Sequence, residues 1–293
     1  MVYDINPEGQ SACYLLYDGK CAVAVDPGMA YSAKIQAEQI RSVIGDQPVE
    51  AVLLTHSHYD HVAAIPYFKK IWPHLKIYGA AYAKKVLSKP EVRKTMRELS
   101  ENAAALNQTC LDADYDESLL GVDEVVSEGD ILHFGDMTVR VIETIGHTRC
   151  SLSYFVDEHW LLAGETFGLS NHDGSYNPEF LVSFKKARES IDKCRQLPVK
   201  TLCFPHKGMV EDPEESGLWQ WLSDGLDESL EVICRALNSS EDPEAQLELM
   251  EKRYWMPWRP GGWPRKAFDL NAAAMLRTVA REFPERIENR REK

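Results

Sequence analysis

The feature that most constrains the fold is an apolar run that leads directly into a cluster of histidines. Residues 49–55, VEAVLLT, are rich in β-formers and almost wholly apolar, so we predict a buried strand there. The next six positions contain His56, His58, Asp60 and His61. Side chains of this kind converge where the strands of an α/β sheet end. The segment therefore favours a fold that contains both sheets and helices.

Apolar β-rich runs and helical spacings recur along the rest of the chain. The expected strands are residues 12–17, 21–25, 49–55, 76–79, 131–134, 137–144, 151–156, 159–163 and 199–204. The expected helices are 31–44, 61–72 and 179–196, with further helices in 80–120 and in most of the chain after 208. Strands followed by helices in each half predict α/β layers, with sheet packed on sheet inside and helices outside. We expect a domain at 1–210, with a helical insertion at about 80–120, and a helical C-terminal extension at 211–293.

Composition narrows the class of protein. The chain has 293 residues, of which 44% are hydrophobic, and this is enough to form a core. Its formal net charge of −13 repels phosphate backbones, so we expect a small-molecule partner and no nucleic acid. No apolar run reaches the ~18 residues of a membrane span, and the first residues lack a signal-peptide pattern. We therefore expect no membrane partner and a cytoplasmic location.

The cysteines indicate thiols in a reducing compartment. There are seven, an odd number, and none has Cys-x-x-Cys spacing. Most are expected to be small core residues.

The cluster at 56–61 has the chemistry of a metal site. His56 and His58 lie two apart in an extended segment, so their side chains can point to the same side. Imidazoles and carboxylates without a thiolate suit zinc, iron or manganese. Three further candidates each follow an expected strand, namely His147, Glu165 and His206. Seven such ligands suit two metals that share a carboxylate, whereas satisfied core or loop histidines are the alternative.

The segment from Thr55 to His61, THSHYDH, resembles the T-H-x-H-x-D-H signature of the metallo-β-lactamase-fold superfamily. The likeness continues in matching order across roughly residues 10–210, through Asp26 in VDPG, Gly146-His147-Thr148, Gly164-Glu165 and His206. This resemblance implies a four-layer αβ/βα sandwich with the metals in a groove at one edge.

The resemblance also implies a role for each ligand. His56, His58 and His147 would hold the first metal, and Asp60, His61 and His206 the second. Glu165 would bridge the two metals. Asp26 would orient a ligand, or else serve only as a turn residue.

Two positions depart from the pattern of the superfamily. The bridging residue is usually Asp, and the extra methylene of Glu165 could change the spacing, number or type of the metals. A Pro-Gly pair commonly follows the third motif, whereas this chain has Arg149-Cys150. We expect Cys150 to be a packed neutral thiol.

These ligands predict a dinuclear metal-dependent hydrolase. Two divalent ions, zinc or else iron or manganese, would lower the pKa of a bound water from about 15.7 to about 7. Asp60 would orient that water. Thioesters, esters and lactones fit best as substrates, and phosphate or sulfate esters are an alternative. A mononuclear-iron oxidoreductase of the dioxygenase type and a non-catalytic relative are further alternatives. The retention of both His61 and His206 favours two metals and hydrolysis.

Three other segments carry weaker expectations. In residues 170–176, His172 or Tyr176 could face the substrate, or the segment could be an ordinary polar loop. The aromatic segment 254–264 could form a lid over the site, or it could dock a terminal helix. The apolar positions of 267–283 offer a contact for a homodimer. His74, His133 and His159 lack a ligand-like setting and are expected to be structural.

Overall fold

The structure is a computed structural model that describes residues 1–5, 13–170, 174–206, 208–255 and 265–287. Its contacts divide the chain into two compact units. The first comprises Met1–Glu143, Cys150–Gly164 and Val199–Glu211, and the second comprises Thr144–Arg149, Glu165–Pro198 and Asp212–Lys293. The predicted domain boundary at residue 210 stays a prediction.

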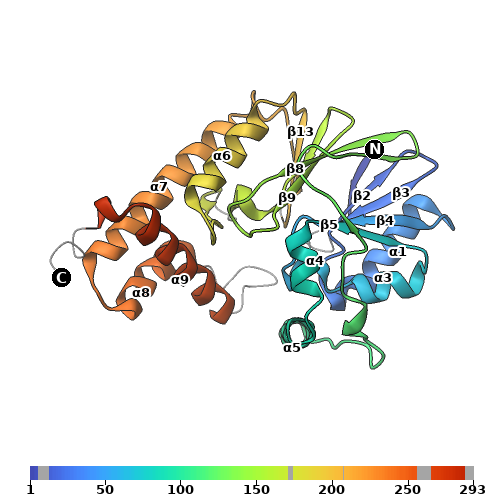
Figure 1. Ribbon diagram of the computed structural model, residues 1–293, viewed down its shortest axis with the longest axis horizontal. Helices are drawn as coiled ribbons and strands as arrows, with labels where there is room; N and C mark the ends of the chain where they lie inside the picture. Colours follow the sequence, from blue (N-terminus) through green and yellow to red (C-terminus); the bar gives the residue numbers. More distant parts are fainter. Residues whose placement is uncertain (6–12, 171–173, 207, 256–264, 288–293) are drawn as a thin grey trace. The chain divides into compact units, whose positions relative to one another are not determined.

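The first unit contains a sheet in which six strands lie in sequence order (Figure 1). These strands are β1 (Val2–Asp4), β2 (Tyr14–Tyr17), β3 (Ala22–Val25), β4 (Val49–Leu53), β5 (Lys76–Gly79) and β6 (Glu124–Val125). Strands β3 to β6 pair in parallel. Since parallel strands end at the same edge of a sheet, the residues after β3 and β4 are neighbours.

The same unit contains a second sheet of six strands, in the order β14-β13-β10-β9-β8-β7. Their bounds are β7 (Ile131–Phe134), β8 (Met137–Glu143), β9 (Leu152–Val156), β10 (Trp160–Leu162), β13 (Thr201–Phe204) and β14 (Gly208–Glu211). The chain after 208 was expected to be mostly helical, and the short strand β14 at its start was not predicted. That short strand pairs antiparallel with β13 and supplies the edge of the sheet.

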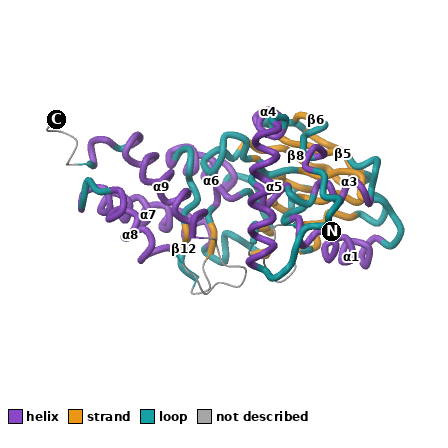
Figure 2. The backbone as a smooth tube through the Cα atoms, turned by 90° about the horizontal axis from the view of Figure 1, so that it is seen from below, coloured by secondary structure: helices purple, strands orange, loops and turns teal. Residues whose placement is uncertain are grey.

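Side chains of the first sheet alternate between two cores. In β4, Val52 packs in a cluster with residues of α1 (Ala33–Ile44) and α3 (Ile65–Ile71). Ala51 and Leu53 pack instead against residues of the second sheet. Because successive side chains of a strand point to opposite faces, helices pack on one face of this sheet and the second sheet packs on the other. Figure 2 shows the strands with α1 and α3 beside them. The predicted mixed α/β sandwich is confirmed.

The remaining helices of this unit are α2 (Tyr59–Val62), α4 (Ala81–Leu87) and α5 (Pro90–Leu106). We predicted one helix over 61–72, but the structure has two helices there, α2 and α3, with a break after Val62. Pro66 lies in the first turn of α3. A proline has no N–H to donate, so it is suited to the start of a helix and unsuited to its interior.

The second unit is mainly helical. Its elements are β11 (Leu169–Ser170), β12 (Tyr176–Asn177), α6 (Phe184–Arg195), α7 (Leu218–Ser239), α8 (Pro243–Tyr254) and α9 (Arg265–Glu282). Helix α6 begins later than the predicted residue 179, because the Ser183 side chain caps it by accepting from the Lys186 N–H at 3.1 Å. Within the described ranges, no helix is both long and apolar enough to cross a bilayer.

The apolar face of α9 packs inside this unit. Phe268, Met275, Leu276 and Val279 are all buried within the chain. The homodimer contact that was expected at 267–283 stays a prediction. Residues 256–264 lie outside the described residues, so the lid expected there stays a prediction as well.

Tyr176 is held between two glycines of the second unit. A Cβ added to Gly168 would lie 2.5 Å from the tyrosine ring, and one added to Gly225 in α7 would lie 2.3 Å from it. Both distances are shorter than real carbon contacts. The tight packing of β12 against α7 therefore requires glycine at both positions.

The first prediction tests this packing. Gly225→Ala forces its methyl group into the Tyr176 ring, so we expect a loss of about 1–3 kcal/mol in the free energy of unfolding. The measurement is urea denaturation followed by circular dichroism. Gly121→Ala is the control, because its Cβ would meet nothing within 4 Å. Equal unfolding midpoints for the two variants would contradict the packing argument.

Candidate metal centre

A buried carboxylate lies at the centre of the first unit's ligand cluster. Asp26 directly follows β3, is 2% exposed, and has a left-handed backbone with φ of 49°. Its N–H donates to the Leu53 carbonyl at 3.0 Å, which fixes it beside the end of β4. One carboxylate oxygen accepts from the Thr55 N–H at 2.8 Å, and the other accepts from the Thr55 hydroxyl. The second oxygen also lies 2.9 Å from His61 Nδ1.

These hydrogen bonds determine which nitrogen of each imidazole carries a proton. A carboxylate only accepts, so His61 donates from Nδ1. The single proton of the Thr55 hydroxyl is directed at Asp26, so Thr55 Oγ1 accepts from His56 Nδ1 at 3.0 Å. Both neutral rings therefore carry their lone pair on Nε2. A carboxylate that orients histidines in this way is typical of metal sites.

Three more ligand-type groups of the first unit lie near these rings. His58 occupies the N-cap position of α2, the helix that carries Asp60 and His61, and the rings of His56 and His58 are 4.7 Å apart. His206 follows β13 with a left-handed φ of 62°. Its Nε2 lies 3.4 Å from His61 Nε2, and Asp60 Oδ2 lies 3.7 Å from each of these nitrogens.

This spacing fits a bound cation. Ligands at about 2.1 Å from a tetrahedral zinc are separated from one another by about 3.4 Å. The three atoms from Asp60, His61 and His206 lie near that separation. The donor set, two imidazoles and a carboxylate, also suits zinc, iron or manganese.

Two buried tyrosines brace the segments that carry the ligands. The Tyr154 hydroxyl donates to the Leu54 carbonyl at 2.7 Å, two residues before His56. The Tyr14 hydroxyl donates to the Phe204 carbonyl at 2.6 Å, two residues before His206. Burial raises the pKa of both phenols, so each remains a proton donor.

The second unit contributes an imidazole and a carboxylate that meet directly. His147 Nδ1 lies 2.7 Å from the Glu179 carbonyl, which only accepts, so Nδ1 carries a proton. His147 Nε2 lies 2.9 Å from Glu165 Oε2. When the imidazole is neutral and protonated on Nδ1, His147 Nε2 and Glu165 Oε2 are both acceptors. A proton or a cation must therefore lie between these two atoms. This pair is therefore suited to share a metal.

The turn that carries His147 is closely packed. A Cβ on Gly146 would lie 2.7 Å from Ala187 of α6 and 2.7 Å from Thr166. The Thr166 hydroxyl accepts from the His147 N–H at 3.1 Å and donates to the Thr144 carbonyl. Thr166, the neighbour of Glu165, thus holds the two ligand segments of this unit together.

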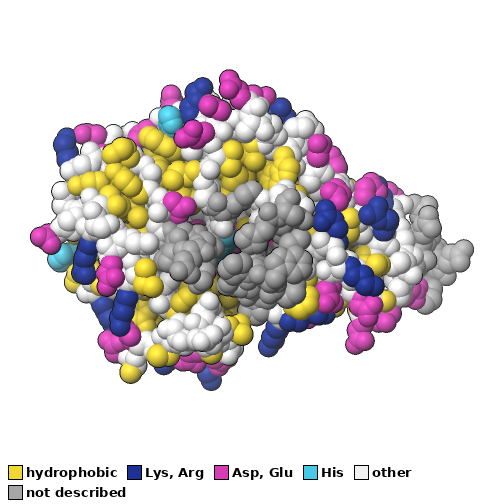
Figure 3. Space-filling view, turned by 180° about the vertical axis from the view of Figure 1, so that it is seen from behind, with side chains coloured by type: hydrophobic (Ala, Val, Ile, Leu, Met, Phe, Trp, Pro, Cys, Tyr) yellow, Lys and Arg dark blue, Asp and Glu magenta, His cyan; other side chains and the backbone are white. Residues whose placement is uncertain are grey.

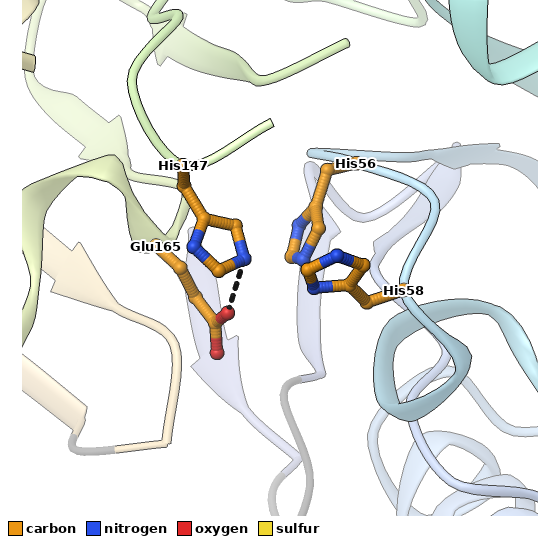
Figure 4. Close-up of side chains that lie close together, drawn as sticks. All are labelled: His56, His58, His147 and Glu165. Carbon is orange, nitrogen blue, oxygen red and sulfur yellow. Dashed lines mark ion pairs between the residues drawn. The ribbon is translucent and has the colours of Figure 1, made fainter. Parts of the chain in front are cut away.

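Within the first unit, the ligand-type atoms of Asp26, His56 and His61 lie within 4.8 Å of one another. Those of His56 and His58, and those of Asp60, His61 and His206, meet the same limit. Within the second unit, His147 and Glu165 form the ion pair that Figure 4 marks with a dashed line. Each of the seven predicted ligands, and Asp26, belongs to one of these clusters. That these residues bind a metal stays a prediction.

The other residues singled out in the sequence have different settings. Tyr176 is only 4% exposed, and its role in substrate binding stays a prediction. His172 lies outside the described residues. Cys150 is buried, with its sulfur 3.4 Å from the Ser57 hydroxyl. His74, His133 and His159 belong to none of the ligand groups formed by the described residues. All seven cysteines lie in the described ranges, and no disulfide joins them.

Two residues of the site were missed in the sequence. Thr55 stands in the quoted motif, and its position beside His56 was a usable signal that was given no role. Glu179, whose carbonyl contacts His147, carries no comparable signal. It lies 32 positions from His147 in a stretch without a motif.

Comparison with known proteins gives a consistent match. A family model described as "Metallo-beta-lactamase superfamily" matches residues 6–206. The chain is 28% identical over 191 residues to a hydroxyacylglutathione hydrolase of Erwinia tasmaniensis, covering 64% of this chain and 58% of that protein. It is 26% identical over 252 residues to a hydroxyacylglutathione hydrolase of Francisella philomiragia, covering 74% and 84%.

Solved structures share the fold. A metallo-beta-lactamase family protein of Thermus thermophilus matches with a TM-score of 0.63 at 19% identity, covering 92% of this chain and 88% of that one. An archaeal metallo-beta-lactamase superfamily protein of Sulfolobus tokodaii matches with a TM-score of 0.58 at 20% identity, covering 96% and 98%.

The second prediction tests the hydrogen-bond chain through Thr55. Thr55→Val removes the hydroxyl between His56 and Asp26 at nearly constant volume. Groups that support a metal ligand typically contribute 10–100-fold to metal affinity, so we expect a loss of about tenfold or more. The measurement is competition with a chromophoric zinc chelator. Thr55→Ser keeps the hydroxyl and should bind zinc like the native protein, and native affinity in Thr55→Val would refute the role of the chain.

Proposed function

The chain belongs to the metallo-beta-lactamase superfamily, and we propose that it is a dinuclear metal-dependent hydrolase that cleaves acyl thioesters. One observation carries this proposal. The hydrogen bonds of Asp26 orient His56 and His61 with their Nε2 lone pairs outward, and His61 Nε2 lies 3.4 Å from His206 Nε2, as two ligands of one cation would.

Two divalent ions are proposed because the seven ligand-type side chains are too many for one tetrahedral ion, which takes three or four protein ligands. Asp60, His61 and His206 form one cluster of the first unit, and His56 and His58 form a separate pair there. Glu165 has two carboxylate oxygens, so it can serve two ions. Zinc is the expected metal, and iron and manganese suit the same donors.

The residues of the chain divide the remaining work. Divalent ions bound at such a centre act as Lewis acids and lower the pKa of bound water from about 15.7 to about 7. Asp26 and Thr55 hold the imidazoles in one tautomer, so the ligands do not have to reorient during the reaction. Asp60 accepts a hydrogen bond from the attacking water and orients it toward the carbonyl carbon.

A thioester is the proposed substrate class. Hydroxyacylglutathione, which appears in the names of both relatives, is an acyl thioester. The chain spans only 58% of the length of the Erwinia protein, so the thioester comes to this chain as a proposal. Esters and lactones present the same electrophilic carbonyl and are the next candidates. A small molecule as the partner, a homodimer and a cytoplasmic location stay predictions.

The third prediction tests the activity. His58→Ala removes a ligand-type side chain that is partly exposed, so we expect the fold to persist and thioester hydrolysis to fall by more than 100-fold. The substrates are an acyl-glutathione, a lactone, a phosphodiester and a sulfate ester. His74→Ala, a change at an exposed histidine outside the ligand groups, should hydrolyse them at the native rate.

Two outcomes of that assay would overturn the proposal. Full turnover by His58→Ala would show that the site is assigned wrongly. Oxygen consumption on a thiol substrate, by protein that contains one iron per chain, would favour a mononuclear oxidoreductase.

The fourth prediction tests the number of metals. Elemental analysis of native protein purified without added metal should give two divalent ions per chain. His206→Ala removes a ligand from the cluster of Asp60, His61 and His206 and leaves His56 and His58 intact, so it should retain about one ion. A native count of one, unchanged in His206→Ala, would contradict a dinuclear centre.

A further inference from the structure

We propose that Asn271 of helix α9 is a positioning residue for His147, acting through the buried side chain of Glu179. The proposal rests on the proposed function only in taking His147 as a metal ligand. It gives helix α9 a specific role, which is to support a metal ligand, in addition to its apolar packing. All the residues that carry it belong to the second unit.

The first link joins His147 to Glu179. The Glu179 carbonyl lies 2.7 Å from His147 Nδ1, and the Glu179 carboxylate lies 3.7 Å from the same nitrogen. The carbonyl only accepts, so its hydrogen bond holds the proton on Nδ1 and directs Nε2 toward Glu165, and the carboxylate places a negative charge beside the same nitrogen. The orientation of the imidazole therefore depends on where Glu179 is held.

The second link joins Glu179 to Asn271. The Asn271 amide donates from Nδ2 to Glu179 Oε2 at 3.2 Å. Glu179 is 1% exposed, and a buried carboxylate is expensive unless donors surround it. The amide of Asn271 therefore both stabilises this carboxylate and fixes its position.

A strap, defined as residues 179–183, extends this connection along the helix. On its α9 side, the Leu181 carbonyl accepts from the Thr278 hydroxyl at 2.8 Å, and the Val182 carbonyl accepts from Arg281 at 2.6 Å. Just past the strap, the Lys185 N–H donates to Glu282 at 3.0 Å. Helix α9 thus holds the strap at several points.

The other side of the strap contacts the turn that carries the ligand. The N–H groups of Val182 and Ser183 both donate to the Gly146 carbonyl, at 2.9 and 3.2 Å. Gly146 precedes His147 and, as described above, is closely packed against α6. The strap therefore joins α9 to the backbone of the His147 turn as well as to the imidazole.

The helix presents these groups in register because of its own geometry. Asn271 and Thr278 are seven residues apart, which is close to two turns, so they lie on one face of α9. Ala272, Met275, Leu276 and Val279 of the same helix are buried. The apolar packing of α9 thus sets the position from which Asn271 reaches Glu179.

The fifth prediction separates a hydrogen-bond role from simple packing. Asn271→Ala removes the donor, and the nearly isosteric Asn271→Asp replaces it with a carboxylate that repels Glu179. Because Asn271 acts through another residue, we expect zinc affinity to fall by about tenfold in Asn271→Ala, at the low end of the range for such supporting groups. Asn271→Asp should lose at least as much, whereas packing alone would leave it near native.

Asn238→Ala is the matched control. It also removes an asparagine hydrogen bond of the second unit, from α7 to the Arg286 carbonyl at 2.9 Å, but it does not touch the strap. Zinc affinity is measured by chelator competition and should stay native in this variant. Native affinity in both Asn271 variants, or an equal loss in Asn238→Ala, would overturn the proposal.

Hydrogen exchange of the metal-free protein gives a second readout. In Asn271→Ala, peptides that cover 144–149 and the strap should exchange faster than in the native protein, and in Asn238→Ala they should not. Unchanged exchange in Asn271→Ala would overturn the positioning role. This measurement needs neither metal nor substrate. A native protein that bound zinc but failed on every thioester would therefore refute the proposed function and leave this inference standing.

Discussion

The site of the first unit depends on one buried carboxylate. Asp26 accepts from the backbone and the hydroxyl of Thr55 and pairs with His61, so a single side chain aligns the end of β3, the end of β4 and helix α2. Burying a carboxylate is costly unless donors satisfy it, and here the donors are the groups that the site needs in fixed positions. The carboxylate thereby determines the tautomer of two imidazoles as well as the path of the chain.

Local patterns made much of this molecule predictable. The strand that ends at residue 53 and the histidines after it are close in sequence, so spacing alone indicated a metal site. Contacts between distant residues were not predictable in this way. Tyr14 and Phe204 are 190 positions apart, and their hydrogen bond leaves no trace in either segment. The helix expected from residue 179 likewise begins at Phe184, because Ser183 caps it and the preceding residues form the strap.

The C-terminal helices illustrate the same limit. The apolar spacing of α9 predicted an interface, and the sequence left open whether the partner was this chain or another. Phe268, Met275, Leu276 and Val279 are buried within the chain, and the polar Asn271 and Thr278 contact the strap. Helix α9 therefore has both a packing face and a row of polar contacts, and the apolar periodicity of its sequence detects only the packing face.

Figure 3 shows the opposite side of the molecule from Figure 1, where apolar side chains lie among charged ones on the surface.

The left-handed backbones of Asp26 and His206 have a consequence for how this protein tolerates change. Residues with a Cβ are held in that conformation at a penalty of about 1 kcal/mol or more, which the surrounding sandwich must offset. Glycine would relax either position and would at the same time remove a side chain on which the proposed chemistry depends. Selection for thermal stability alone would therefore favour glycine at both positions and would yield inactive variants. Selection for catalytic activity would instead retain both strained residues.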